Sequence, residues 1–359
     1  MPRPPSCAPS PASNGDLAAV FAAAMSALAP AASLWPAAVA VSGGGDSLAL
    51  MLLLRDYARD QGLDAPVVLT VDHALRPASR REALATARWA KAAGLVCHIL
   101  TRKGPPPAAD IEAVARQARY QLIGDWAGRH RVATVFLAHT LDDQAETFLI
   151  RLLRGSGVDG LSAMRPVSAF PLAGYGGLRV ARPLLRQTRD DLRGFLTGCG
   201  QSWHDDPMNE DDRFTRVKLR QAWPMLEGLG FQRDRLADTA DHLARARDAL
   251  EAATDALEAA AVQPLADRLL LDRAQLAAAP AELGLRLLAR LLMRVSAQDY
   301  RPRFERLNRL YLAIVSGDLQ TGRTLHGCKI APAPRRLAKK STNLLQISAE
   351  PGDRRRFPS

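Results

Sequence analysis

Two short polar stretches of the sequence contain residue types that could bind an anion and a cation. Residues 42–47 read Ser-Gly-Gly-Gly-Asp-Ser. Three consecutive glycines leave backbone N–H groups uncovered, so these groups can converge on a phosphate while the serine hydroxyls add donors. The second stretch combines His139 with three acids, Asp142, Asp143 and Glu146. Carboxylates of this kind could hold Mg²⁺ or a cationic substrate.

The glycine stretch lies between two apolar runs. Residues 38–41 are small and β-branched, which predicts a buried strand, and the leucine-rich run 48–54 predicts a helix. The usual P-loop ends in Gly-Lys-Ser/Thr, whereas no lysine stands here. A plain glycine turn capped by Asp46 and Ser47 is the alternative. The strand before the glycines and the helix after them favour a phosphate site.

The acidic stretch follows an apolar run, residues 134–138, that also predicts a strand. A capping box between Asp143 and Glu146 would explain these two acids in structural terms alone. It would leave the adjacent Asp142 without a role. Two neighbouring acids exceed what a helix cap needs, so we favour a polar site beside the glycine stretch.

Strands and helices are predicted to alternate through the first part of the chain. The strands are residues 38–41, 67–71, 96–100 and 134–138, and the helices are 48–54, 80–93, 111–129 and 188–199. This alternation predicts an α/β fold with a doubly wound, mainly parallel sheet whose strand ends meet at one edge. Asp72 follows one of these strands, and the sequence leaves open whether it joins the site or caps the next helix.

Changes in composition divide the chain into four segments. Residues 1–15 are rich in proline and are predicted to be a disordered tail, and residues 16–228 are predicted to form the catalytic domain. A shift to alanine, arginine, aspartate and leucine with helical periodicity predicts a mostly helical second domain over residues 229–316. Residues 317–359 are predicted to be a small C-terminal extension with a basic tail.

The charge balance favours a polyanionic partner. The 359 residues include 48 Lys and Arg against 37 Asp and Glu, a formal net charge of +11. Such an excess indicates nucleic acid, although an arginine-rich proteome would produce the same bias. No apolar run approaches the roughly 20 residues of a membrane span, and no secretory signal is recognisable. The four cysteines are far apart without a CxxC pair, so reduced thiols and a cytoplasmic location are expected.

The glycine stretch resembles the SGGxDS signature of the PP-loop ATP pyrophosphatases, and further stretches resemble the tRNA(Ile)-lysidine synthetases among them. Collinear matches to the family's motifs occur at residues 71–76, 110–120, 139–147, 152–157, 203–209 and 214–220. Two positions depart from the family pattern. Thr140 replaces the second of two histidines, which leaves His139 in place, and Val217 replaces an asparagine next to Arg216.

The resemblance implies a PP-loop, adenine-nucleotide α-hydrolase-like fold and a specific reaction. ATP would adenylylate O2 of the wobble cytidine, position 34, in the isoleucine tRNA with a CAU anticodon, and pyrophosphate would leave. The ε-amine of free L-lysine would then displace AMP at C2 to give lysidine. A helical second domain and basic tail would grip the tRNA backbone. The sequence does not fix the oligomeric state, and a homodimer is compatible with it.

The resemblance also implies roles for individual residues. ATP would be bound by Ser42, Gly43, Gly44, Gly45, Asp46, Ser47, Asp72 and His139. The catalytic set would be Asp46, Asp142, Asp143, Arg116 and Arg216, with Mg²⁺ on Asp46 and Asp143. In this set the acids would hold Mg²⁺ or the lysine ammonium, and the arginines would neutralise charge that grows on the phosphate.

Two alternatives remain at this point. A related PP-loop enzyme could thiolate tRNA, but members of that class commonly need paired cysteines, and none are paired in this sequence. A nucleic-acid-binding relative without catalysis is the other. The intact glycine stretch and acid cluster argue against the second alternative. An ATP–pyrophosphate exchange assay would distinguish an active enzyme from a relative without catalysis.

Overall fold

The computed structural model describes residues 14–75, 77–104, 111–204, 215–298, 300–319, 321–334 and 343–350. The chain divides into two compact units, one up to Ala244 and one from Arg245 onward. The division falls inside the longest helix, α9 (Arg233–Ala261). Boundaries after residues 228 and 316 remain predictions, and the predicted tail lies mostly outside the described residues.

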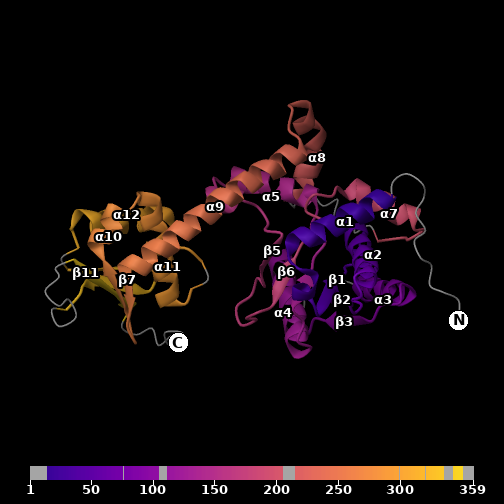
Figure 1. Cartoon of the computed structure of the whole chain (residues 1–359), viewed down its shortest axis with the longest axis horizontal. Coiled ribbons are helices and arrows are strands. Elements are labelled where there is room, and N and C mark those ends of the chain that lie inside the picture. Colours follow the sequence, from indigo (N-terminus) through magenta and orange to yellow (C-terminus); the bar gives the residue numbers. More distant parts are fainter. Residues whose placement is uncertain are drawn as a thin grey trace. The chain divides into compact units, whose positions relative to one another are not determined.

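The first unit is built on the predicted doubly wound sheet (Figure 1). Its strands are β1 (Ala37–Ala40), β2 (Val67–Asp72), β3 (Cys97–Thr101), β4 (Thr134–Phe136), β5 (Val167–Ala169) and β6 (Arg179–Ala181), in the order β3-β2-β1-β4-β6-β5. All neighbours are parallel except β5, which runs antiparallel to β6. Successive crossovers run outward from β1 in both directions. The topological switch point, where such sheets bind ligands, therefore lies between β1 and β4.

Helices cover both faces of this sheet because alternate residues of β1 point to opposite sides. Ala37 and Val39 belong to one buried cluster, while Ala38 belongs to the cluster formed with α4. Burial on both faces explains why the strand reads as a continuous apolar run. The helices of this unit are α1 (Asn14–Leu28), α2 (Gly45–Asp60), α3 (Pro77–Ala92), α4 (Ile111–Arg129), α5 (Leu141–Leu153), α6 (Val158–Leu161), α7 (Arg189–Gly198) and α8 (Thr215–Gly228).

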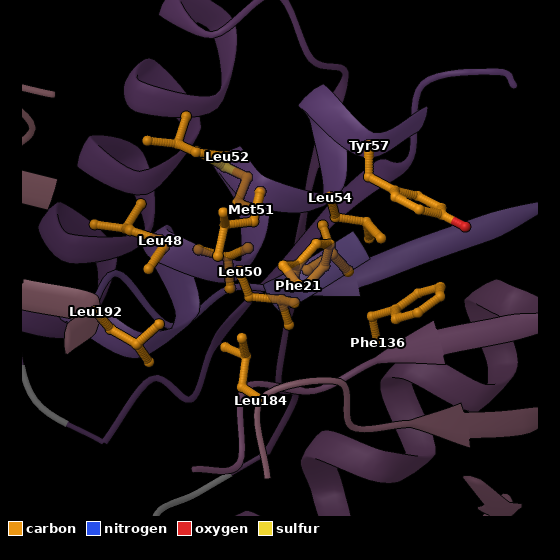
Figure 2. Packing of buried hydrophobic residues seen from close by; sticks show 14 of the residues in the cluster. Phe21, Leu48, Leu50, Met51, Leu52, Leu54, Tyr57, Phe136, Leu184 and Leu192 are labelled. Atoms are coloured by element: carbon orange, nitrogen blue, oxygen red, sulfur yellow. The ribbon is translucent and has the colours of Figure 1, made fainter. Parts of the chain in front are cut away.

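Helix α2, which follows the glycine stretch, is the most deeply buried of these helices. Leu48, Leu50, Met51 and Leu54 are fully covered, and they pack with side chains from α1, β4 and α7 (Figure 2). Each such side chain contributes about 1.5–3 kcal/mol on burial. This packing fixes the start of α2, and hence the glycine stretch, against the sheet.

The second unit combines helices with a sheet. Its helices are α10 (Arg273–Ala278), α11 (Ala281–Ser296) and α12 (Phe304–Ser316), as the helical periodicity predicted in outline. Its five strands are β7 (Val262–Pro264), β8 (Leu269–Asp272), β9 (Arg323–Leu325), β10 (Cys328–Pro332) and β11 (Leu344–Ala349), all antiparallel in the order β7-β8-β11-β10-β9. The sequence indicated only a short β-like piece here, because β8 and β11 lie far apart along the chain.

Two further expectations have outcomes in the described residues. None of the helices described is long and apolar enough to cross a membrane. Cys97 and Cys328 are not in disulfides, but Cys199 is disulfide-bonded, so the expectation of reduced thiols is wrong at that position.

Candidate active site

The glycine stretch forms a turn whose hydroxyl groups hold its own backbone. Ser47 Oγ accepts from the Ser42 N–H at 3.2 Å and donates to the Gly44 carbonyl at 2.9 Å. Helix α2 then begins at Gly45, and no side chain caps it. The first N–H groups of a helix lack intrahelical partners and carry partial positive charge. The turn therefore presents uncovered donors at the C-terminal end of β1.

Gly43 allows this turn to lie close to its neighbours. Its φ of +91° lies in the left-handed region, and a Cβ atom here would approach Thr86 Oγ1 to 2.7 Å and His204 Cδ2 to 3.0 Å. The carbonyl of Gly43 also accepts a hydrogen bond from the N–H of His204 at 2.9 Å. The position requires glycine on both conformational and steric grounds.

Arg189, the first residue of α7, connects the glycine turn to the acid cluster. Its Nη2 is 2.7 Å from Asp143 Oδ1, its Nη1 is 3.0 Å from Glu146 Oε1 and its Nε is 3.4 Å from Asp46 Oδ2. The backbone N–H of Arg189 donates to Asp142 Oδ2 at 3.0 Å. The three predicted acidic site residues and Glu146 therefore come together around Arg189, Asp142 through the backbone N–H and the other three through the guanidinium group.

Two more arginines complete this cluster. Arg220 Nε lies 2.7 Å from Glu146 Oε1, and Arg233 Nε lies 2.9 Å from Asp142 Oδ1. The Arg233 guanidinium also sits over the Trp223 ring, 4.1 Å from its centroid. These side chains, together with Arg189, line a small cavity of about 80 Å³. The cavity therefore has charged groups of both signs in its wall, and Arg189 connects it to the glycine turn through Asp46.

Asp143 has a capping role as well as a place in the cluster. Thr140 is the N-cap of α5, and its side chain accepts from the Asp143 N–H while Asp143 Oδ2 accepts from the Thr140 N–H at 2.9 Å. The capping box thus pairs Thr140 with Asp143, and not Asp143 with Glu146, the pairing that was the purely structural alternative. Thr140, where the family pattern has histidine, supplies the hydroxyl that the cap needs.

Burial and charge separate the ionisation of the two key acids. Burial, reinforced by Asp143 and Asp142, raises the pKa of Asp46 to about 6 although Arg189 opposes this shift. Burial acts in the same direction on Asp143, but Arg189 and the hydrogen bond from the Thr140 N–H outweigh it and hold its pKa below the usual range. Of these two acids, Asp143 is therefore the firmly ionised one, and Asp46 is the one whose charge is less compensated.

The two predicted arginines lie near different charged groups, Arg116 near His139 and Arg216 near Asp143. Arg116 lies on α4 with its guanidinium 5.2 Å from the Tyr120 ring centroid, and Arg216 Nη2 lies 3.5 Å from Thr147 Oγ1. Burial, with the charges of Arg182, Arg119 and Arg116, depresses the pKa of His139, so its imidazole is neutral. Its Nδ1 is buried without a hydrogen-bond partner among the described residues. The basic group around His139 suits a phosphate or a nucleobase edge.

Asp72 is engaged locally rather than aimed at the acid cluster. It is buried at the end of β2, where its Oδ1 accepts from the Ala74 N–H at 3.0 Å and from Ser79 Oγ at 2.7 Å. These contacts fix the start of α3. A nucleotide-binding role for Asp72 remains a prediction.

The residues present fit the phosphates of ATP and a magnesium ion that travels with them. Gly43 leaves a cradle that a Cβ would fill, and Asp46 stands in the first turn of α2. No three acidic, histidine or cysteine side chains in the described part of the chain form a ready-made metal cage. Mg²⁺ usually binds through one or two carboxylates plus substrate phosphates, which is what Asp46 and Asp143 could offer.

Comparisons with known proteins agree with this geometry. The family model described as "PP-loop domain" matches residues 20–225. A tRNA(Ile)-lysidine synthase from Bradyrhizobium sp. is 40% identical over 344 residues, covering 91% of this chain and 94% of the relative. The chain belongs to the tRNA(Ile)-lysidine synthase family. Another member, from Ruegeria pomeroyi, is 49% identical over 203 residues, which are 56% of this chain but only 47% of that relative.

Among solved structures, the fold is similar to that of the U34-tRNA thiolase NcsA from Methanococcus maripaludis. The TM-score is 0.52 with 15% sequence identity, over 63% of this chain and 79% of that one. At this identity the likeness supports the PP-loop fold alone. Family membership makes the chain an ATP-using ligase of tRNA modification, and it confirms the fold class expected from the sequence.

Sequence reasoning missed Arg189, the residue on which the acid cluster converges. One signal was present, because a cation in the first turn of a helix opposes the helix dipole and so calls for an explanation. Arg189 occupies that position, next to the acids Asp190 and Asp191 of the same turn. Glu146 and Arg220 were noticed as parts of charged stretches without assigned roles. Thr86 carried no signal, and His204 lay in the family-like stretch 203–209 without a role of its own, since only the fold brings both to Gly43.

Proposed function

We propose that the protein joins free L-lysine to C2 of the wobble cytidine, position 34, in the isoleucine tRNA with a CAU anticodon, at the expense of ATP. One observation carries this proposal. A phosphate-binding turn and a group of four carboxylates, Asp46, Asp142, Asp143 and Glu146, meet at Arg189. A reaction between an activated nucleotide and an amino acid with a cationic side chain needs these two subsites side by side.

The proposed reaction has two steps. Cytosine O2 attacks the α-phosphorus of ATP, the bond to the β-phosphate oxygen breaks and pyrophosphate leaves. The lysine ε-nitrogen then attacks C2, the C2–O2 bond breaks, AMP leaves with that oxygen and the nitrogen loses a proton. In this scheme Gly43 to Ser47 bind the phosphates, and Arg116 and Arg216 neutralise the growing negative charge. Asp46 and Asp143 would hold Mg²⁺, which would neutralise the phosphates of bound ATP.

The test of this function is the incorporation of labelled lysine into a CAU isoleucine tRNA transcript. We expect lysine transfer that depends on ATP, with AMP and pyrophosphate as products and a mass increase at position 34. A methionine tRNA with the same anticodon serves as the control. Release of ADP and phosphate would exclude adenylylation, and modification without lysine would contradict the proposed substrate.

The thiolation alternative is weaker. Relatives that are 34–49% identical are named as lysidine synthases, whereas the thiolase is 15% identical.

We further propose a cytoplasmic location, where ATP and tRNA are found. A homodimer also remains a proposal, which sedimentation would test.

For the second unit we propose that tRNA binds over a basic hollow. A cavity of about 410 Å³ is lined by Arg306, Arg309 and Arg323 with Glu350 and His326. No ion pair joins these three arginines to a carboxylate among the described residues. Tyr300 is exposed beside the hollow, and its ring packs edge to face with the His326 ring at a centroid distance of 4.9 Å. Unpaired arginines next to an aromatic ring can contact both phosphates and bases of RNA.

Replacing Arg309 and Arg323 together by Gln should weaken tRNA binding about tenfold or more, because two phosphate contacts are lost. ATP affinity should stay unchanged. Filter binding of tRNA and calorimetry of ATP would provide the two values. The matched control is Arg129→Gln with Arg131→Gln, which removes the same charge from exposed sites in the first unit. Equal losses in the two double variants would mean that net charge alone, and not the hollow, attracts the tRNA.

A further inference from the structure

Arg189 occupies the place in the acid cluster that a substrate cation would need. Its guanidinium contacts Asp46, Asp143 and Glu146 at 3.4, 2.7 and 3.0 Å. Of these acids, Glu146 has a side chain only 4% exposed and Asp143 one only 10% exposed, while the Arg189 side chain is 19% exposed. An ammonium group that entered this site would meet carboxylates already paired with an internal cation.

The charge count of the cluster explains why such an internal cation is present. Four carboxylates, Asp46, Asp142, Asp143 and Glu146, face three guanidinium groups, from Arg189, Arg220 and Arg233. Removing Arg189 would leave partly buried acids close together without their shared partner, which is strongly unfavourable.

The position of Arg189 also makes it the movable member of the cluster. It stands at the first residue of α7, in the first turn with Asp190 and Asp191, and its contacts are made by a long side chain. Its Asp46 contact is the longest of its three and leads directly to the phosphate turn. A triphosphate bound at that turn offers a guanidinium group stronger, bidentate partners than a carboxylate at 3.4 Å.

We propose that Arg189 is an internal substitute for the substrate's ammonium group and that it sets the order of binding. Its guanidinium holds the subsite of Asp46, Asp143 and Glu146 until the phosphates of ATP draw it toward the glycine turn. The departure of Arg189 leaves Asp46 and Asp143 to Mg²⁺ and frees Glu146 to accept the lysine side chain, so lysine binds after ATP. This inference rests on the proposed function, because it takes lysine as the amine substrate.

For the reaction, this order would prevent lysine from binding before ATP. Lysine that arrived first would occupy the acids with no activated nucleotide to attack. With Arg189 as the first occupant, the ammonium subsite opens only where phosphates are present. Arg189 acts here through the carboxylates and is a positioning residue.

The test measures L-lysine binding to the full chain by calorimetry, with and without a non-hydrolysable α,β-methylene ATP analogue and Mg²⁺. In the wild type we expect the analogue to tighten lysine binding at least tenfold. Arg189→Gln should bind lysine at least tenfold more tightly than the wild type without the analogue, and the analogue should then add little. Equal lysine affinity of the wild type in both states would overturn the proposal, as would a variant that keeps the full dependence on the analogue.

Two further arms keep the test decisive. Arg186→Gln is the matched control, because Arg186 pairs with Asp238 and Asp241 outside the cluster, and its lysine coupling should equal that of the wild type. If Arg189→Gln fails to fold, Arg189→Lys is the alternative variant. It retains the charge but lacks the guanidinium group that reaches three acids, so the ATP analogue should tighten lysine binding less than in the wild type. If the wild type incorporates lysine into tRNA but its lysine affinity does not depend on the ATP analogue, this inference alone is overturned. Absence of both incorporation and lysine binding would overturn the proposed function as well.

Discussion

Asp143→Asn should lower the turnover of lysine transfer by at least a hundredfold, which corresponds to about 3 kcal/mol at roughly 1.4 kcal/mol per tenfold. The carboxylate serves two partners at once. Oδ2 accepts from the Thr140 N–H and Oδ1 accepts from Arg189. An asparagine can keep the oxygen for the cap, but its amide NH₂ would then face a guanidinium. The variant should therefore retain α5 while losing the charge that fixes Arg189 and could bind a cation.

The chain provides a matched control for the capping part of this effect. Asp191 makes the same capping box with Thr188 at the start of α7, and its side chain is exposed. Asp191→Asn should change the free energy of unfolding by less than about 1 kcal/mol and leave turnover normal. Asp143→Asn should lose about 1–3 kcal/mol of stability, since a partly buried ion pair is broken. Near-normal lysine transfer in a folded Asp143→Asn protein would contradict a role in the site.

Gly43→Ala should abolish measurable ATP binding, an expected loss of at least a hundredfold in affinity. The added methyl group would lie 2.7 Å from Thr86 Oγ1 and 3.0 Å from His204 Cδ2, and alanine at a φ of +91° is strained. The turn must therefore shift, and its N–H groups move away from their common target. Calorimetry with the ATP analogue measures the loss, and thermal unfolding shows whether the fold survives.

Gly45→Ala separates stability from binding in the same turn. A Cβ at Gly45 would meet its nearest neighbours, Leu196 and Trp203, at an ordinary 3.7 Å, and alanine suits the first position of a helix. This variant should unfold at the same temperature as the wild type or slightly above it. Wild-type ATP affinity in Gly43→Ala would show that the turn does not bind the phosphates.

The sequence predicted those parts of the fold that depend on local periodicity. The predicted helix over residues 111–129 matches α4, and residues 188–199 match α7 with its two caps. The start of α3 was placed at Arg80, whereas the helix begins at Pro77, a residue well suited to the first helical turn. The sheet of the second unit was missed, because β8 becomes recognisable as a strand only when β11 pairs with it from the end of the chain.

In the candidate site, too, local features were predictable from the sequence and contacts between distant segments were not. The glycine turn and the acids of α5 were recognisable because each lies in one short stretch with chemistry of its own. Arg189 was not, since its carboxylate partners come from α2 and α5, which are distant along the chain. Arg116 and Arg216 were singled out by the family resemblance, and the fold brings Arg116 into the charge environment of His139 and Arg216 into that of Asp143. Spacing along the chain gives no information on such long-range pairs.

The ion pairs between α9 and α11 determine how salt should act on RNA binding. Within the second unit, Arg286, Arg290 and Arg294 are each joined to acids of α9: Glu251, Asp255 and Glu258. An arginine already neutralised inside the protein displaces few counterions from RNA. These three arginines should therefore add little to the slope of log affinity against log salt concentration. Each phosphate contact contributes a slope of about 0.7–0.9. The slope therefore counts the arginines that the protein has left unpaired, and it should fall well below the value that the total of 48 Lys and Arg would suggest.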